Sequence, residues 1–263
     1  MTGEAVEEVK EKRKYLVPSV ETSFKILKLL SSSQHRESTL TQIAKELSIN
    51  VSTCFRILQV LEEMSVVHYN KRTKQYTLGS YLVILGERAK EYMSYIRLCR
   101  PYLEDISRKT GLTSVLIQRI RPSKLAYVDK VDGSDFSINI TVGKRFDVAD
   151  GSFGMCFVAH MNEADRKLYL EANNVFKQKN PEEKDEYLRR VNQVKEQGYA
   201  ITYGDFSKGI FGLSAPVFNE EGEVILTISA FGATTVSQRE DLESIGEIVK
   251  AAAADASRKL GGI

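Results

Sequence analysis

The chain has 263 residues, of which 42% are hydrophobic and 27% charged, and its 37 basic and 35 acidic residues leave a net charge of +2. These values exclude a wholly disordered chain and fit one large or two smaller domains. The three cysteines and three histidines are widely separated, no apolar run reaches the ~20 residues that span a bilayer, and the N-terminus lacks the apolar stretch of a signal peptide. We therefore expect a cytoplasmic protein without a disulfide scaffold, a bound metal, a cofactor or a membrane partner.

The charge is distributed unevenly along the chain. Residues 1–9 carry three acidic residues, residues 10–79 carry 12 basic and 6 acidic residues, and the rest is close to neutral. A local positive excess is the electrostatic footprint of nucleic-acid binding, although many solvated helices show one too. We expect residues 1–14 to form a charged flexible arm in front of a basic domain.

A first helix is predicted after Val17-Pro18, with Ser19 as its N-cap. We expect its apolar stripe, set by helical spacing, to face the core. The stripe consists of Val20, Phe24, Leu27 and Leu30.

Two more helices follow, joined by the turn Ser48-Ile49-Asn50. Ser38 or Thr39 can cap the first of them, and Asn50 can cap the second. Their apolar positions keep helical spacing: Leu40, Ile43, Ala44 and Leu47, then Cys54, Ile57, Leu58 and Leu61. Two helices joined by such a short turn form a helix-turn-helix, whose second helix enters the major groove of DNA.

The hydrophobic period changes after Met64. Two short strands, 66–69 and 75–78, are predicted around the basic turn 70–74. A hairpin directly after the third helix forms the wing of a winged helix.

Polar and basic side chains mark the expected DNA-binding face. On the third helix they suit phosphates at its start and base edges further along, and on the hairpin tip they suit phosphates. The candidate DNA-binding residues are Asn50, Ser52, Thr53, Arg56, Gln59, Lys71, Arg72 and Lys74. The alternative is a small helical domain with a solvated face, which the order of helix, turn, polar helix and basic hairpin disfavours.

Residues 39–79 resemble the winged helix of the IclR family of bacterial transcription regulators; they read TLTQIAKELSINVSTCFRILQVLEEMSVVHYNKRTKQYTLG. The residues that match the recognition helix and the wing of that family are Ser52, Thr53, Arg56 and Leu58, then Tyr76, Leu78 and Gly79. Ser48 and Ser65 stand where the family usually has glycine, and we expect both turns to survive at modest cost. The resemblance implies that residues 15–79 bind palindromic operator DNA as part of a homodimer or homotetramer.

The next segment has apolar residues 3, 4, 3 and 4 positions apart: Leu82, Leu85, Ala89, Tyr92 and Ile96. This spacing fits either a short coiled-coil seam or an amphipathic helix packed on its own domain. The resemblance favours a linker helix over residues 80–100 that helps to join two subunits, with Pro101 at its end or at the start of the next helix.

Residues 101–263 alternate helices and strands, which predicts an α+β domain with a mostly antiparallel sheet. The expected helices are 102–110 (closed by Gly111), 151–160, 162–170, 181–197 and 237–260. The expected strands are 114–118, 125–128, 138–142, 200–203, 210–218 and 224–231.

Residues 197–233 resemble the effector domain of the IclR family; they read QGYAITYGDFSKGIFGLSAPVFNEEGEVILTISAFGA. That domain is a GAF-like fold that binds small organic molecules in a pocket between its sheet and the loop before a glycine-containing helix. By position, the resemblance implies the effector-binding residues Ser152, Phe153, Gly154, Thr202, Gly212, Ser229 and Phe231. N–H groups at a helix start favour a carboxylate, and phenyl rings supply apolar contact.

Several positions depart from the family pattern. Ala149 and Met155 replace its usual His and Lys. Gly212 stands where many members carry Cys, and Phe231 where many carry a small polar residue. We therefore expect an effector with an aromatic or other apolar body, with or without one acidic group. The alternative is a pocket that aromatic rings fill, in a DNA-binding protein that senses no ligand.

An enzyme is the remaining alternative. Residues 101–263 contain no GxSxG, no phosphate-binding loop and no GxGxxG after a strand. The candidate general acids and bases are the loop residues Asp129, Asp132, Asp135, Asp147, Asp150 and Asp205. Such acids are common on solvated loops, so we expect no catalytic residues and a ligand-responsive, DNA-binding transcription regulator.

Overall fold

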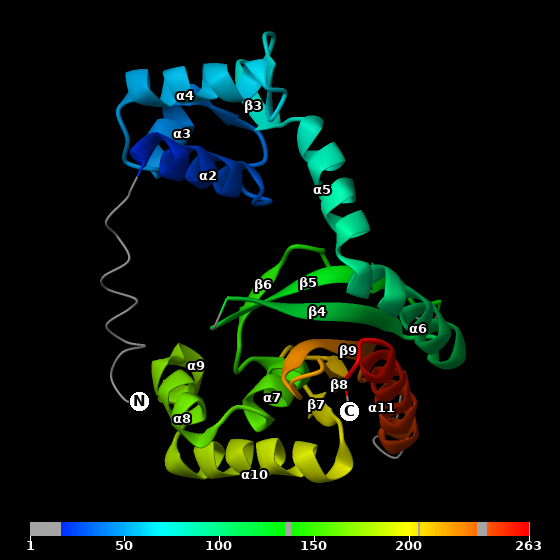
Figure 1. The fold of residues 1–263 in the computed structure, drawn as a ribbon. Helices are drawn as coiled ribbons and strands as arrows, with labels where there is room; N and C mark the ends of the chain where they lie inside the picture. Colours follow the sequence, from blue (N-terminus) through cyan, green and yellow to red (C-terminus); the bar gives the residue numbers. More distant parts are fainter. Residues whose placement is uncertain (1–16, 122, 135–137, 205, 236–240, 263) are drawn as a thin grey trace. The chain divides into compact units, whose positions relative to one another are not determined.

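The computed structural model describes residues 17–121, 123–134, 138–204, 206–235 and 241–262. The chain falls into two compact units, an N-terminal unit over Met1–Tyr92 and a C-terminal unit over Met93–Ile263, and each is described by itself (Figure 1). The predicted arm over residues 1–14 lies outside the described residues.

The N-terminal unit contains helices and a small antiparallel sheet of strand order β1-β3-β2. Its helices are α2 (Pro18–Leu30), α3 (Leu40–Glu46), α4 (Val51–Glu63) and α5 (Tyr81–Tyr92). Its strands are β1 (Ser38–Thr39), β2 (Val67–Asn70) and β3 (Gln75–Leu78). The predicted helix-turn-helix and wing are therefore confirmed as α3, α4 and the β2–β3 hairpin.

Local chemistry explains where α3 and α4 begin. Thr39 caps α3 in a capping box with Gln42, and Asn50 caps α4 by accepting a hydrogen bond from the N–H of Ser52. The apolar stripes of both helices pack into one core with α2 and the sheet. Its fully or nearly buried members include Ile26, Leu30, Ile43, Cys54, Leu58 and Tyr76.

The prediction for α2 is wrong in two respects. The helix begins at Pro18 with Val17 as its N-cap, so Ser19 is a helical residue and caps nothing. In the predicted stripe, Val20 and Phe24 are 53% and 68% exposed, while Leu30 is buried and Leu27 packs against the core as expected. Ile26, which was not in the stripe, is fully buried. Both faces of α2 carry apolar residues, so spacing alone could not decide which face meets the core.

The turns at the two serine positions keep the left-handed conformation that glycine favours. Ser48 has φ 52° and Ser65 has φ 57°. Next to the second turn, a Cβ on Gly79 would lie 2.2 Å from the carbonyl O of Ser65, so this glycine is required for a close backbone contact.

The expected linker helix over residues 80–100 is two helices. α5 ends at Tyr92, Met93 has non-helical ψ 76°, and α6 runs over Ser94–Thr110. Pro101 lies inside α6 and ends no helix. The turns before and after it are held in the same core, because Cys99 and Leu103 are both fully buried, and this packing offsets the local cost of a mid-helix proline.

The C-terminal unit is built on one six-stranded antiparallel sheet of order β6-β5-β4-β9-β8-β7, which confirms the expected α+β fold. Its strands are β4 (Thr113–Arg121), β5 (Lys124–Val131), β6 (Arg145–Asp147), β7 (Ala200–Tyr203), β8 (Ile210–Phe218) and β9 (Val224–Ala233). Its further helices are α7 (Gly151–Ala159), α8 (Glu163–Ala172), α9 (Asn174–Gln178), α10 (Pro181–Gln197) and α11 (Asp241–Lys259).

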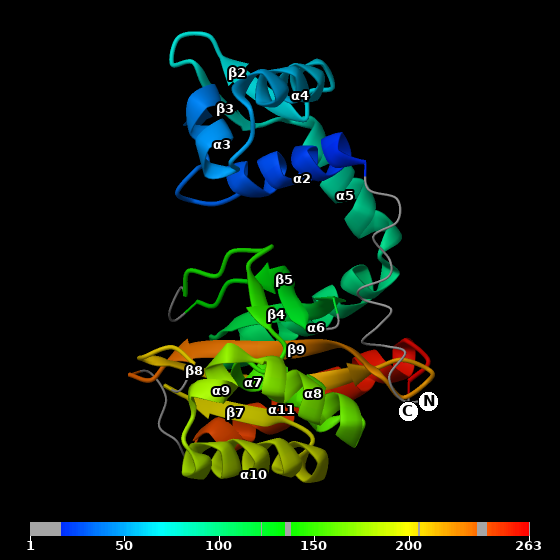
Figure 2. The ribbon, with the colours of Figure 1, turned by 90° about the vertical axis from the view of Figure 1, so that its left-hand side faces the viewer.

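The sheet separates two cores. Alternate residues of β9 such as Ile228 and Ala230 pack with α6 and α11, whereas Phe231 packs with α7 on the other face. α10 packs on α7 in a further cluster that includes Tyr187 (Figure 2). α7 is thus enclosed between the sheet and α10, and eight of its nine residues are buried.

One expected strand of this unit is absent from the structure. No strand forms over the described residues 138–142. The N–H of Ile140 donates a hydrogen bond to the carbonyl O of Ile138 in a tight turn. The side chain of Ile140 is nevertheless buried, although the residue lies in an irregular segment. The edge strand is β6 instead. Sequence analysis also missed the short α9, and the predicted start of the last helix at residue 237 lies outside the described residues.

Candidate DNA-binding surface and ligand pocket

The start of α4 presents the polar side chains that were predicted for DNA. Oδ1 of Asn50 accepts hydrogen bonds from the backbone N–H and the Oγ of Ser52, both at 2.8 Å. Ser52, Arg56 and Gln59 are exposed on the face opposite the buried stripe of the helix, and Thr53 is half-buried at its edge. An Arg and a Gln on such a face can each make paired hydrogen bonds to guanine or adenine edges.

The wing ends in a compact basic turn. Oδ1 of Asn70 accepts hydrogen bonds from the N–H groups of Arg72 and Thr73 at 3.0 and 3.2 Å, and Lys74 has φ 56°. Lys71, Arg72 and Lys74 are all exposed. The structure thus holds three cations on one turn, an arrangement suited to phosphate contacts.

Sequence analysis did not single out the exposed apolar residues of α4, and two of them lie beside its polar face. Val51 and Phe55 are 47% and 42% exposed and lie beside the polar residues Ser52 and Gln59. Apolar side chains at such positions can contact the methyl group of thymine. The sequence could have revealed them, because helical spacing places Val51 and Phe55 outside the apolar stripe that packs into the core.

The seven predicted effector residues all lie in the C-terminal unit and are all buried. The side chain of Ser152 on α7 connects to the sheet through a row of hydroxyl groups: its Oγ lies 2.8 Å from Oγ of Ser214, which lies 2.7 Å from Oγ of Ser229. Ser214 was not predicted, although it stands two residues after Gly212 on the same face of β8. This row joins α7 to β8 and β9.

Aromatic rings fill the space between α7 and the sheet. The ring of Phe153 lies 6.3 Å from that of Phe231 and 5.3 Å from that of Phe146, measured between centroids. A Cβ on Gly212 would lie 2.8 Å from Cε1 of Phe231, so the glycine leaves room for this ring. At these positions the rings form core.

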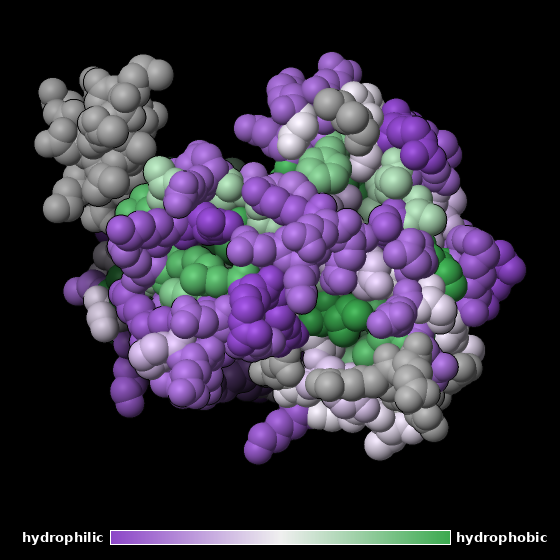
Figure 3. All heavy atoms as spheres, turned by 90° about the horizontal axis from the view of Figure 1, so that it is seen from below, coloured by the Kyte–Doolittle hydropathy of each residue, from purple (hydrophilic) through white to green (hydrophobic). Residues whose placement is uncertain are grey.

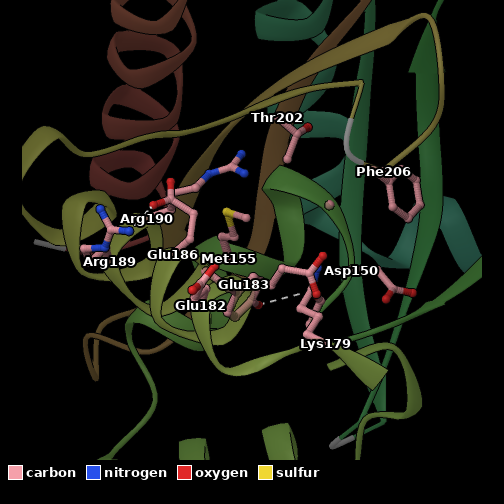
Figure 4. A pocket seen from close by; sticks show the side chains of 13 residues that line it. Asp150, Met155, Lys179, Glu182, Glu183, Glu186, Arg189, Arg190, Thr202 and Phe206 are labelled. Atoms are coloured by element: carbon pink, nitrogen blue, oxygen red, sulfur yellow. Dashed lines mark hydrogen bonds and ion pairs between the residues drawn. The ribbon is translucent and has the colours of Figure 1, made fainter. Parts of the chain in front are cut away.

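A cavity of about 490 Å³ opens beside the aromatic cluster, between α7, α10 and β7 (Figure 4). Of the seven predicted residues, Thr202 lines it, and the other six do not. Its apolar wall includes Ala149 and Met155, the two positions where the family's His and Lys are replaced, together with Tyr187 and Phe206. The size falls in the range of small-molecule sites.

Polar groups at the start of α7 shape this cavity. Asp150 is the N-cap residue of α7, and its Oδ2 accepts a hydrogen bond from the N–H of Asp147 at 2.9 Å. Burial is the main cause that raises the pKa of Asp150 above its usual value. The hydroxyl of Tyr187 donates to the carbonyl O of Ala149 at 3.1 Å, and burial raises the pKa of this tyrosine.

Of the four loop acids considered for catalysis that the structure describes, three are engaged in ion pairs. Asp129 pairs with Arg100 at 2.7 Å, Asp132 with Lys130 at 2.8 Å, and Asp147 with Lys124. The other three acids are Asp150, at the cavity, and Asp135 and Asp205, which lie outside the described residues. Within the described part of the chain no group of His, Cys, Asp and Glu side chains could hold a metal ion, and no helix is long and apolar enough to cross a bilayer.

Comparison with known proteins decides the family. Residues 19–71 match the IclR helix-turn-helix domain, and residues 88–258 match the C-terminal domain of the bacterial transcriptional regulator IclR. The chain belongs to the IclR family. It is therefore a helix-turn-helix transcriptional regulator, and the family and its characterised relatives are regulators rather than enzymes.

Relatives of this regulator match it over almost their full length. The regulator XynR of Escherichia coli is 26% identical over 94% of this chain and 98% of its own, and KdgR of the same organism is 25% identical over 93% of each. The crystal structure of an IclR regulator from Alicyclobacillus acidocaldarius is 35% identical and has a TM-score of 0.85, covering 94% of this chain and 100% of its own. The two-domain architecture of this regulator is thus that of its family.

Proposed function

We propose that this regulator binds a palindromic operator as a homodimer or a dimer of dimers, and that a small organic effector bound to the C-terminal unit changes its affinity for DNA. The observation that carries the proposal is the outward face of α4. Ser52, Arg56 and Gln59 lie exposed on the second helix of an IclR helix-turn-helix, opposite a fully packed core.

Each predicted DNA-binding residue has a role in this proposal. Arg56 and Gln59 read base edges in the major groove, and the side chains at the start of α4 contact phosphates. The wing cations contact the backbone. The residues that make the backbone contacts are Asn50, Ser52, Thr53, Lys71, Arg72 and Lys74.

The proposed homo-oligomer is supported by apolar side chains on α5. Tyr81, Val83, Ile84, Leu85 and Tyr92 are 43–78% exposed. Exposed apolar residues concentrated on one helix mark a surface that another chain covers. A second copy that packs on α5 would bring two winged helices to two half-sites, which a palindromic operator requires.

The proposed effector site is the cavity between α7, α10 and β7. A protein of the same fold, from Microbacterium hydrocarbonoxydans, was crystallised with 4-hydroxybenzoate; it is 17% identical with a TM-score of 0.77. This supports a ligand-binding role for the fold. An effector that binds one arrangement of the subunits better than another would change DNA affinity by a coupling free energy of about 1–3 kcal/mol.

A second candidate is a regulator that senses no ligand. The aromatic cluster around Phe153 and Phe231 favours it, because the rings occupy the space between α7 and the sheet. In that case the cavity would be an unused surface feature. Titrating a small-molecule library against the operator complex separates the two candidates.

Selection of bound sequences from random DNA tests the proposal as a whole. We expect an enriched site with two-fold symmetry, bound by two copies of the chain per site, with an affinity that falls steeply as salt rises. Enrichment of an asymmetric site bound by one copy, or no enrichment over random DNA, would contradict it. Analytical ultracentrifugation of the complex gives the number of copies.

A further inference from the structure

Four acidic side chains surround the cavity of the C-terminal unit. They are Asp150 at the start of α7, and Glu182, Glu183 and Glu186 on α10 (Figure 4). Three basic side chains also line it, so the described residues of the lining carry a formal charge of −1. Figure 3 shows the face that carries α10, where hydrophobic surface appears in hollows between mostly hydrophilic side chains.

Part of this charge is engaged within α10. Oε2 of Glu186 lies 2.6 Å from Nη2 of Arg189, in an ion pair. An oxygen of Glu183 accepts a hydrogen bond from the N–H of Asn180 at 2.9 Å, which completes the capping box of the helix. Both contacts lie within α10 and its N-cap and stabilise the helix itself.

Arg190, one of the three basic residues of the lining, is hydrogen-bonded to the sheet. Arg190 donates from Nη2 to the carbonyl O of Ile201 on β7 at 2.6 Å. A bond to a backbone group does not cancel a charge, whereas the pair of Glu186 and Arg189 is neutralised. The other charges of the described lining are those of three acids and two bases: Asp150, Glu182, Glu183, Lys179 and Arg190.

The position of Asp150 opposes an anionic ligand. The N-terminus of a helix carries the positive end of its dipole and normally attracts anions. At the N-terminus of α7 the N-cap residue is itself a carboxylate, and its hydrogen bond goes to the N–H of Asp147 rather than to the first turn of α7. A ligand carboxylate at this end of the cavity would meet a like charge in a partly buried place.

We propose that the cavity binds an organic cation with an aromatic or aliphatic body, and that Asp150 is the counter-charge for its protonated nitrogen. Met155, Tyr187 and Phe206 provide the apolar wall for the body. The inference departs from the acidic group that the family resemblance allowed. It rests on the proposed effector role only for its consequence at the operator, since binding can be measured without DNA.

Calorimetry on the full chain, with three probes of similar shape, tests the charge preference. The probes are 3-phenylpropan-1-amine, 3-phenylpropan-1-ol and 3-phenylpropanoate at pH 7. We expect the amine to bind about tenfold more tightly than the alcohol and the carboxylate to bind most weakly, because Asp150 forms a charge-assisted hydrogen bond with the cation and repels the carboxylate. A carboxylate that binds as tightly as the amine, or no binding by any probe, would overturn the proposal.

The variant Asp150→Asn tests whether the carboxylate of Asp150 causes the preference for the amine. We expect this variant to lose about tenfold in affinity for the amine and to keep its affinity for the alcohol, because only the amine uses the negative charge. The matched control is Glu171→Gln, which removes an exposed acid of α8 outside the lining and should leave all three affinities unchanged. An Asp150→Asn protein that still prefers the amine by the same factor contradicts the assignment; if this variant does not fold, Glu182→Gln, with a smaller loss for the amine alone, replaces it.

Operator binding by the same preparations separates the two ways of failing. If the wild-type chain binds its selected site but shows no preference for the amine, the charge assignment fails and the DNA-binding proposal stands. If it prefers the amine but selects no DNA sequence, the proposed function fails and the binding site stands.

Discussion

The two units of this regulator use hydroxyl and polar side chains in opposite ways. On α4, Ser52 and Arg56 are exposed, and the packing of the helix does not depend on them. In the C-terminal unit, Ser152, Ser214 and Ser229 are fully buried and bond to one another. Residues matched by position to a family pattern can therefore be exposed to solvent in one domain and be buried, hydrogen-bonded parts of the core in another.

Removing a ring of the aromatic cluster should change the free energy of unfolding more than any of the other substitutions below. Phe153 is fully buried against Tyr127, Phe146 and Phe231. We expect Phe153→Ala to lower the free energy of unfolding of the C-terminal unit by about 3–5 kcal/mol, because it removes buried area and leaves a cavity. Urea denaturation followed by circular dichroism measures this. A loss below about 1 kcal/mol would mean that the ring lines an adaptable site rather than core.

The hydroxyl row should respond more strongly than an exposed serine. We expect Ser214→Ala to cost about 1–3 kcal/mol of unfolding free energy, because it leaves the hydroxyl groups of Ser152 and Ser229 without their shared partner. Ser52→Ala on α4 is the matched control and should stay within about 0.5 kcal/mol. Equal effects of the two changes would erase the contrast between the units.

The left-handed serines of the N-terminal unit offer a gain in stability. Ser48 and Ser65 have positive φ, where a side chain costs about 1–2 kcal/mol and glycine none. We expect each serine-to-glycine change to raise the unfolding free energy by about 0.5–1 kcal/mol, the gain being reduced by the greater chain entropy of glycine. Ser33→Gly, in the exposed turn after α2, serves as the control. Destabilisation by either change would show that the serine side chains hold these turns.

The smallest effect concerns a property that both units share. Burial raises the pKa of the Cys54 thiol to about 11 and that of the Cys99 thiol to about 12, and Cys156 is fully buried with a raised pKa as well. We expect no reaction with a thiol reagent at pH 8 in the native protein and three thiols after denaturation, since the thiolate is the reactive form. Rapid native labelling would indicate that one core opens locally.

Sequence patterns succeeded where one face of an element carries all of its apolar residues. The buried stripe of α4 and the cap at Asn50 followed from spacing and side-chain chemistry, and both are confirmed. The prediction of the buried face of α2 was partly wrong because both faces of this helix carry apolar residues. The prediction of a helix boundary at Pro101 was wrong because tertiary packing on both sides of this residue overrides its tendency to end a helix.

The ligand pocket was the harder problem. Position in a family pattern locates backbone, but the side chains that fill the space depend on neighbours far away in the sequence. Gly212 pairs with Phe231 across the strands and leaves room for its ring, and the cavity lies beside α10 rather than in the space that this ring occupies. The α10 residues that line the cavity carry no motif, so sequence analysis had no signal for them.

Recognition of DNA bases by the exposed face of α4 is the central prediction, and one variant tests it directly. The ratio of the dissociation constants for scrambled and selected DNA should be measured by fluorescence anisotropy for the wild-type chain, for Arg56→Ala and for the control Arg36→Ala, which removes an exposed arginine outside α4. We predict that Arg56→Ala lowers the ratio by a factor corresponding to about 1–3 kcal/mol, while Arg36→Ala leaves it unchanged. A ratio for Arg56→Ala equal to that of the wild type would contradict the account.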